Sequence, residues 1–102
     1  MVLARKVLES VTWYLFNSSI LALVASVSGV YWLGINNQVI YIGSSANLHE
    51  RLSDHYYTVD QCIGQARQFA IDPCFNYKER ERRLLQAFLA KYGRLPKCND
   101  RI

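Results

Sequence analysis

The middle of the chain carries side chains whose types and spacing suit phosphate chemistry. Arg51 and His55 are four residues apart, which places them on the same side of a helix, beside an apolar stripe that includes Leu52. A guanidinium and an imidazole in a half-buried position need a partner, because an unpaired buried charge is costly. Tyr31 and Tyr41 lie shortly before them in the chain and add two phenols. Together these groups predict a pocket for a phosphate.

The carboxylate of Glu81 is the second candidate for chemistry. On a helix over residues 77–92, Glu81 falls in the centre of the apolar stripe, whereas Glu79 points to solvent. The stripe consists of Leu84, Leu85, Phe88 and Tyr92. A carboxylate on a buried face needs a compensating charge. That charge is either an arginine such as Arg51, in an ion pair, or a divalent metal such as Mg²⁺ or Mn²⁺, which prefers oxygen ligands and retained waters.

A predicted β-hairpin positions the two tyrosines. Its arms, 30–33 and 39–42, are rich in aromatic and β-branched residues, and its turn falls within 34–37. Tyr31 and Tyr41 are ten residues apart. A three-residue loop would therefore set them side by side on one face, whereas a two-residue loop would place them on opposite faces. We expect the three-residue loop.

A helix over about 46–56 is expected to follow the hairpin directly. Ser44 and Ser45, which come after Gly43, are predicted to cap this helix. The unpaired amides in the first turn of a helix attract anions. The start of this helix, after Ser44 and Ser45, is therefore a candidate site for an anion such as phosphate.

These residues resemble the core motifs of the GIY-YIG nucleases, from about residue 29 to residue 99. The matching pieces are Gly29-Val30-Tyr31, Tyr41-Ile42-Gly43-Ser44-Ser45, Asn47-Leu48, Arg51, His55, the run Glu81-Arg82-Arg83-Leu84-Leu85 and the closing Pro96-Lys97-Cys98-Asn99. The first motif reads GVY, a mild variant. The gap between Glu81 and Asn99 is longer than in compact members of the family.

The resemblance implies a metal-dependent endonuclease that hydrolyses phosphodiester bonds in DNA to 5′-phosphate and 3′-hydroxyl ends. Glu81 would hold one Mg²⁺ or Mn²⁺ ion, and Arg51 would neutralise the charge that grows in the transition state. Tyr31 would activate the water with help from a neutral His55, and Tyr41 would position the phosphate.

The resemblance also implies contacts to phosphate and DNA outside this central group. The candidates are Gly43, Ser44, Ser45, Asn99, Arg82 and Arg83. Asn99 would in addition brace the site. With one site per chain, a monomer would nick DNA, and cutting both strands would need a dimer or two encounters.

The remaining pattern predicts an α/β fold with a small, mostly antiparallel three-stranded sheet flanked by helices. The third strand is expected at 67–71, after a loop at 58–65, and the helix of Glu81 is expected to stop at Gly93. Residues 1–102 are expected to form one domain, with an N-terminal preamble over 1–28 and a catalytic core over 29–99. The preamble would consist of a short helix at 2–10, a strand or extended segment at 11–16, and a short helix that is capped by Ser18 or Ser19 and runs through Ala25.

The C-terminal third of the chain is strongly basic. Residues 77–102 contain eight Lys and Arg residues against three acidic ones. This distribution favours a polyanion such as DNA as the partner, although many charge runs are only a solvated surface. Binding dominated by phosphate contacts would be weak and sensitive to salt.

The cysteines Cys62, Cys74 and Cys98 are odd in number and form no CxxC pair. This favours a reducing compartment, and hence a cytoplasmic location, with the cysteines as small packing residues. A zinc site that combines them with His55 is less favoured, because the spacings match no common ligand pattern.

Two other classes of protein stay open. A non-catalytic nucleic-acid-binding module would keep the same fold without turnover. The uncharged residues 11–33 would nominally suit a membrane anchor, but Asn17-Ser18-Ser19 and Gly29 interrupt them, so we expect no membrane association.

Overall fold

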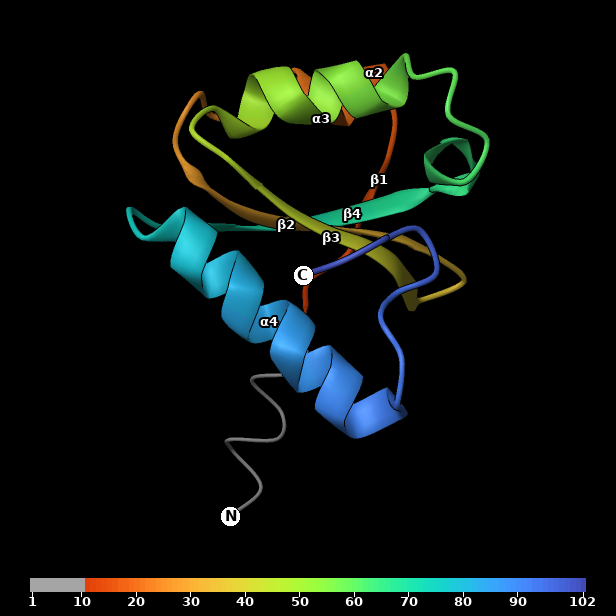
Figure 1. The fold of residues 1–102 in the computed structure, drawn as a ribbon. Coiled ribbons are helices and arrows are strands. Elements are labelled where there is room, and N and C mark those ends of the chain that lie inside the picture. The colour runs from red at the N-terminus through yellow and green to blue at the C-terminus, as the bar shows by residue number, and fades with distance from the viewer. Residues whose placement is uncertain (1–10) are drawn as a thin grey trace.

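A four-stranded antiparallel sheet forms the centre of the molecule, with helices against both faces (Figure 1). The computed structural model describes residues 11–102, so the helix expected at 2–10 lies outside the described residues. In chain order the elements are β1 (Tyr14–Leu15), α2 (Ser18–Leu21), β2 (Gly29–Ile35), β3 (Gln38–Ser45), α3 (Leu48–Tyr56), the 3₁₀ helix η1 (Ile63–Gln65), β4 (Gln68–Pro73) and α4 (Tyr77–Tyr92).

The strands follow the order β1-β4-β2-β3, and each neighbouring pair is antiparallel. The expectation of three strands is wrong by one, because β1 adds a short fourth strand that pairs Tyr14 with Phe69 and Leu15 with Gln68. A strand of two residues is too short to produce an alternating pattern that could be found in the sequence. In this order β2 is central, and β3 lies at an edge of the sheet.

The β2–β3 hairpin has a two-residue turn, so the prediction of a three-residue loop is wrong. Ile35 pairs with Gln38. Asn36 and Asn37 between them have φ angles of 54° and 63°. Two successive positive φ angles are typical of the type I′ turn, whose twist matches that of the flanking strands.

A β-bulge nevertheless keeps both tyrosines on one face of the sheet. The pairing shifts between Leu33 and Gly34, which leaves Ile40 without a partner in the ladder. One extra residue in the strand has the same effect on side-chain direction as one extra residue in the loop. Tyr31 and Tyr41 therefore share a face, as predicted, but they lie diagonally across the two strands rather than directly opposite each other.

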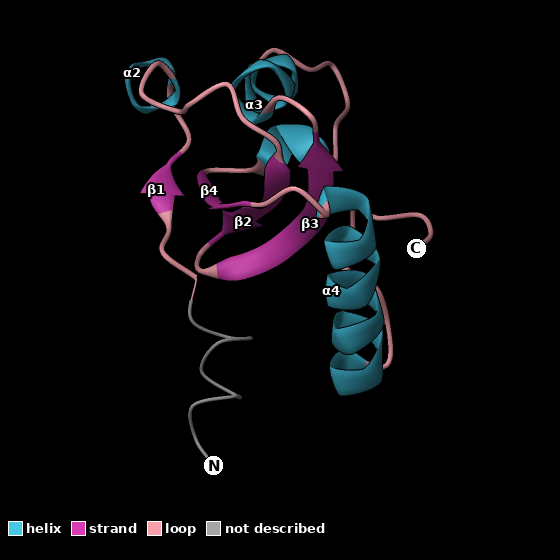
Figure 2. Cartoon of the chain, turned by 90° about the vertical axis from the view of Figure 1, so that its left-hand side faces the viewer, coloured by secondary structure: helices cyan, strands magenta, loops and turns pink. Residues whose placement is uncertain are grey.

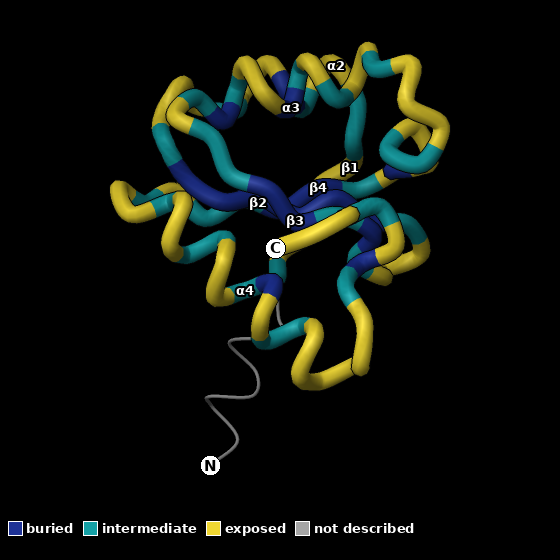
Figure 3. Tube along the Cα trace, in the orientation of Figure 1, coloured by how far each residue is buried: buried dark blue, intermediate teal, exposed yellow. Residues whose placement is uncertain are grey.

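Each face of the sheet has its own hydrophobic core, because successive strand residues point to opposite faces. The core toward α2 and α3 consists of Leu21, Tyr31, Leu33, Ile40, Leu48, Leu52, Ala66 and Phe69. The core toward α4 consists of Val30, Trp32, Ile42, Ala70 and Leu85. Figure 2 shows α4 on one side of the sheet and the other two helices across it. Buried positions run along β2, β4 and β3 (Figure 3).

The ends of the two long helices have specific caps. The side chain of Asn47 caps α3 and accepts a hydrogen bond from the backbone amide of Glu50 at 3.0 Å. The prediction that Ser44 and Ser45 cap this helix is therefore wrong, because both residues still belong to β3. Gly93 ends α4 with a φ of 73°, as predicted.

No helix in the described part of the chain is long and apolar enough to cross a membrane. Residues 11–33, which formed the alternative anchor, instead contribute β1, α2 and most of β2.

Candidate functional site

Two phenols and one imidazole form a cluster between the sheet and α3. The hydroxyl of Tyr31 lies 2.6 Å from Nε2 of His55. The ring centroids of Tyr31 and Tyr41 are 6.1 Å apart, and those of Tyr41 and His55 are 5.5 Å apart. The structure thus brings together three predicted site residues from β2, β3 and α3.

Gly43 makes room for the tyrosine rings. It lies opposite Tyr31 in the β2–β3 ladder. A Cβ atom at position 43 would lie 2.5 Å from Cζ of Tyr31 and 2.9 Å from Cε2 of Tyr41. A side chain at this position would displace one of the two rings.

The environment keeps both phenols in the neutral form. Burial raises the pKa of Tyr31 well above its usual range, the Tyr41 phenol raises it further, and the Arg51 guanidinium opposes the rise. Burial also raises the pKa of Tyr41, with the Glu81 carboxylate as the second cause. The charges of Arg51 and Glu81 therefore act on the pKa of both phenols.

The imidazole of His55 is held in its neutral form. Burial lowers the pKa of His55, and the nearby Arg51 guanidinium lowers it further, against the opposing effect of Asp54 and Asp60. A neutral imidazole has one nitrogen that accepts a hydrogen bond. In the tautomer with its proton on Nδ1, Nε2 accepts the hydroxyl proton of Tyr31.

Glu81 is half-buried on the α4 side of β3, where its Oε1 accepts a hydrogen bond from the hydroxyl of Ser44. Among residues 11–102 no cation forms an ion pair with Glu81, so the alternative pairing with Arg51 is not formed. Glu79 is exposed and pairs with Arg83 at 3.1 Å, as its place on the solvent side of the helix requires. No local pattern in the sequence indicates the contact between Ser44 and Glu81.

Arg51 and Glu81 face the same hollow, at the place where β3, α3 and α4 meet. The hollow has a volume of about 580 Å³. Its lining consists of Ser44, Ser45, Ala46, Arg51, Tyr77, Lys78, Glu81, Arg82, Leu85 and Ile102. Among the described residues that line it, three are cationic and one is acidic. This balance suits an anionic ligand that is held together with a metal ion.

Alternate residues of β3 point their backbone amide and carbonyl groups away from β2, toward the C-terminal segment. Ile40 and Ile42 both face outward, since Ile40 accepts a hydrogen bond from the amide of Cys98 and Ile42 bonds to Asn99. Ser44 is the next residue in this alternation, so its amide faces the same edge. Of the three predicted phosphate ligands in β3, Ser44 is the best placed.

Asn99 holds the backbone of β3 with its side chain. Its Oδ1 accepts from the amide of Ile42 at 2.9 Å, and its Nδ2 donates to the carbonyl of Ile42 at 2.9 Å. The strand held in this way carries Tyr41 and Ser44 on either side of Ile42. The contacts of Asn99 are those of a positioning residue.

The two arginines predicted to contact DNA have different surroundings. Arg82 lines the hollow, next to Glu81 in the chain. Arg83 is paired with Glu79, and its side chain is 74% exposed. Only Arg82 adds its charge to the lining of the hollow.

The N-terminal endonuclease domain of UvrC from Thermotoga maritima has a similar structure. Its crystal structure with magnesium superposes with a TM-score of 0.60 and 25% identity, over 79% of this chain and 92% of that chain. A point mutant bound to its catalytic divalent cation gives a TM-score of 0.62 and 24% identity, over 81% and 93%. The chain has the GIY-YIG fold. Neither a family model nor a curated protein matches the sequence.

The GIY-YIG fold implies a divalent metal, and the groups around Glu81 fit a hard ion. The described residues contain no group of three or more His, Cys, Asp and Glu side chains that could hold a metal, so a zinc site of His55 with the cysteines is not formed. One carboxylate beside a hydroxyl in an open hollow matches Mg²⁺ or Mn²⁺, because such ions keep most of their waters in protein sites.

Two of the three cysteines form a disulfide, Cys62–Cys98, with their Cα atoms 5.7 Å apart. The interpretation of these two as unpaired packing residues is therefore wrong, whereas Cys74 is free and packs beside the core toward α4. The partners are 36 residues apart, and no local pattern in the sequence links them. Because disulfides form in oxidising surroundings, the cysteine count no longer supports a cytoplasmic location.

Proposed function

We propose that this GIY-YIG chain is a metal-dependent endonuclease that hydrolyses phosphodiester bonds in DNA and leaves 5′-phosphate and 3′-hydroxyl ends. The observation that carries the proposal is the common hollow of Arg51 and Glu81, with the Tyr31–Tyr41–His55 cluster electrostatically coupled to it. The crystal structures of the similar UvrC domain hold a catalytic divalent cation, and magnesium in one case.

Glu81 would hold the metal, with Ser44 orienting its carboxylate through Oε1. One Mg²⁺ or Mn²⁺ ion bound there would supply Lewis acidity toward the leaving oxygen and a non-bridging oxygen of the phosphate. The hydrogen bond from Ser44 fixes Oε1 of Glu81 and leaves Oε2 free to bind the metal ion. A carboxylate fixed in this way is preorganised for a cation that keeps its remaining waters.

Arg51 would neutralise the negative charge that develops on the phosphate oxygens. Arg51 is exposed and lines the hollow, where a substrate phosphate can reach its guanidinium. The outward amide of Ser44 would give the phosphate a further donor. Tyr41, which is partly exposed, would position the same group.

Tyr31 and His55 would take the proton from the attacking water. The oxygen of Tyr31 receives that proton as its own hydroxyl proton passes to Nε2 of the neutral His55, 2.6 Å away. Tyr31 has no exposed surface, so its hydroxyl must become uncovered as the substrate binds. The proposed reaction therefore includes a small movement of Tyr41, the ring beside it.

A chain with one such site would nick one strand per encounter, and a transient dimer would be needed to cut both strands together. DNA is the proposed partner, and residues 1–102 are proposed to act as one domain. A cytoplasmic location stays a prediction.

A nicking assay on supercoiled plasmid in Mg²⁺ and in Mn²⁺ tests the function. We expect Glu81→Ala to lower the nicking rate by about a hundredfold or more, because the metal contributes several kcal/mol to stabilising the transition state. Glu79→Ala is the matched control, since this carboxylate lies two residues away on the exposed side of the same helix. It should keep the wild-type rate, and chelation of the metal should stop both proteins.

Binding of the plasmid without cleavage in either metal would overturn the proposal and favour a non-catalytic binding module. Equal nicking rates for Glu81→Ala and Glu79→Ala would show that Glu81 does not take part in the reaction.

A further inference from the structure

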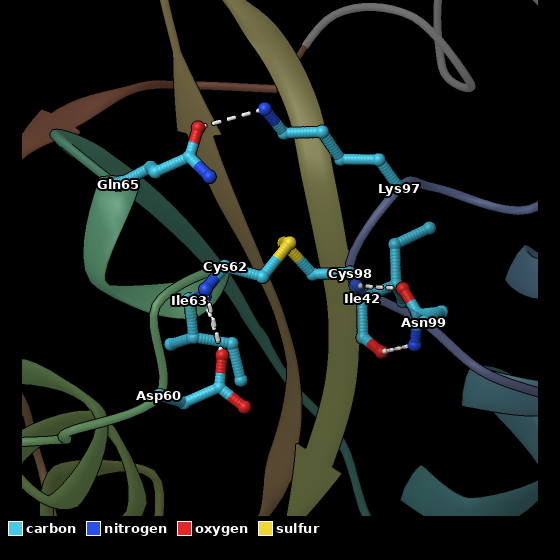
Figure 4. The surroundings of a disulfide bond; sticks show 8 residues. All are labelled: Ile42, Asp60, Cys62, Ile63, Gln65, Lys97, Cys98 and Asn99. Atoms are coloured by element: carbon cyan, nitrogen blue, oxygen red, sulfur yellow. Dashed lines mark hydrogen bonds between the residues drawn. A yellow bond between two sulfur atoms is a disulfide. The ribbon is translucent and has the colours of Figure 1, made fainter.

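The Cys62–Cys98 disulfide joins two segments that follow the two helices of the site. Cys62 lies in the loop after α3, the helix of Arg51 and His55. Cys98 lies in the C-terminal segment after α4, the helix of Glu81. Since α3 and α4 cover opposite faces of the sheet, this bond links the two sides across the edge of β3 (Figures 1 and 4).

The loop end of the link is well defined by local hydrogen bonds. The carboxylate of Asp60 accepts from the backbone amides of Cys62 at 2.9 Å and Ile63 at 3.0 Å (Figure 4). These bonds start the short helix η1 at the cysteine. Cys62 is thus a fixed point on the α3 side of the molecule.

The other end of the link lies directly on β3. The amide of Cys98 donates to the carbonyl of Ile40 at 2.8 Å, and the next residue, Asn99, holds both backbone groups of Ile42. Figure 4 shows the disulfide and the Asn99 contacts side by side. Beyond Asn99 the chain reaches the site, where Ile102 lines the hollow and the charge of Asp100 acts on Tyr41.

Within residues 11–102, one hydrogen bond besides the disulfide joins the C-terminal segment to the α3 side of the molecule. Lys97 donates to Oε1 of Gln65 at 2.8 Å, but both side chains are exposed. A single exposed hydrogen bond contributes little compared with a covalent bond. Cys62 and Cys98 are partly exposed, so a small reductant can reach them.

We propose that the Cys62–Cys98 disulfide is a redox-sensitive brace that keeps the C-terminal segment on the edge of β3 and thereby sets the geometry of the hollow between Arg51 and Glu81. The effect on catalysis rests on the proposed nuclease function, whereas the effect on the edge of β3 does not. A dithiol reductant transfers two electrons and two protons to the Cys62–Cys98 disulfide. The S–S bond breaks, both cysteines become thiols, and the reductant is oxidised to a disulfide. Glutathione disulfide reverses the reaction by thiol–disulfide exchange and leaves as two thiols.

The experiment compares the oxidised protein, the dithiol-reduced protein and the variants Cys62→Ser, Cys98→Ser and Cys74→Ser. Amide hydrogen exchange at Ile42 and Cys98 measures directly how firmly the C-terminal segment is bound to β3. We expect it to be about tenfold faster after reduction or in either disulfide variant, because the segment then opens more often. Cys74→Ser, which keeps the disulfide, should match the oxidised wild type.

Plasmid nicking in Mg²⁺ is the second readout. We expect a loss of about tenfold on reduction and recovery with glutathione disulfide in the wild type and in Cys74→Ser, but no recovery in Cys62→Ser. If no form nicks DNA, the proposed function fails while the exchange data still decide whether the brace exists.

Three results would overturn the proposal. One is that all three thiols of the air-oxidised protein react with a maleimide, which would mean that the disulfide does not form. Another is equal exchange at Ile42 in the oxidised and reduced proteins. The third is faster exchange after reduction with an unchanged nicking rate, which would mean that the C-terminal segment does not set the geometry of the site.

Discussion

The ring of Tyr31 lies over a residue without a side chain, and this contact connects the two sequence motifs. Gly43 sits opposite Tyr31 in the ladder, and the Tyr31 hydroxyl reaches past it to His55. The glycine is needed for the space above it rather than for a special backbone angle, because its φ is not among the positive ones. The position of one phenol thus depends on a missing Cβ atom in the next strand.

Gly43→Ala should move the Tyr31 ring and break its hydrogen bond to His55. We expect a loss of about 1–3 kcal/mol in the free energy of unfolding, as for other overpacked interiors, together with loss of nicking. Chemical denaturation measures the first effect. Gly64→Ala is the control, because a Cβ atom there meets nothing within 4 Å, and it should leave both properties unchanged.

The stability of the protein should depend on pH through His55. Burial and Arg51 lower the pKa of His55 in the folded state, so the unfolded chain binds more protons below its ordinary pKa of about 6.5. Stability is therefore complete above that pH and declines as the pH falls toward the lowered value. Asp54 and Asp60 reduce the effect without reversing its sign.

The measurement is the denaturation midpoint between pH 7.5 and 5.5 for the wild type and His55→Gln. The variant should lose less stability over this range. An equal loss in both proteins would mean that other groups cause the acid sensitivity.

At the scale of elements, the hairpin shows what sequence patterns can predict and what they cannot. The bounds of α4 follow from its apolar stripe and from Gly93, and the structure confirms them. The shared face of the tyrosines was predicted correctly from a wrong loop length, because the bulge at Ile40 supplied the residue that the turn lacks. Whether an extra residue lies in a turn or in a strand depends on pairing with a distant partner, which a local pattern does not contain.

The two-residue turn should make the stability of the protein sensitive to a β-branched residue at position 36. Asn36 has a φ of 54°, which β-branched residues tolerate poorly. Asn36→Val should therefore lower the free energy of unfolding by about 1–2 kcal/mol. Gln38→Val, an exposed strand position beside the turn, should change it by less than about 0.5 kcal/mol. Thermal or urea denaturation distinguishes the two, and equal losses would speak against the type I′ geometry.

At the scale of the whole molecule, the site forms only where three distant segments meet. Arg51 and Glu81 were predicted from their places on helices, and Asn99 from a family motif. That all three lie at one edge of the sheet depends on the strand order and on helices that cover both faces. The disulfide was missed for the same reason, since a pair 36 residues apart is visible only once the chain is folded. Single residues and helix faces could be read from the sequence, whereas contacts between elements could not.

The basic charge of the molecule should make DNA binding depend on salt, with unequal contributions from neighbouring arginines. Arg82 lines the hollow, whereas Arg83 is paired with Glu79 on the exposed side. Arg82→Ala should lower the slope of log affinity against log salt by about one. Arg83→Ala should leave it nearly unchanged. Fluorescence anisotropy of a labelled duplex at several salt concentrations measures the slope, and equal effects would place both arginines on the DNA.

The C-terminal segment also has a consequence for self-association. Without it, the outer side of β3 would present a row of unpaired amides and carbonyls, which invites a strand from a neighbouring molecule. Cys98 and Asn99 occupy these groups at Ile40 and Ile42. The segment from Cys98 to Ile102 therefore protects this edge of the sheet from pairing with another molecule, and Ile102 also lines the hollow.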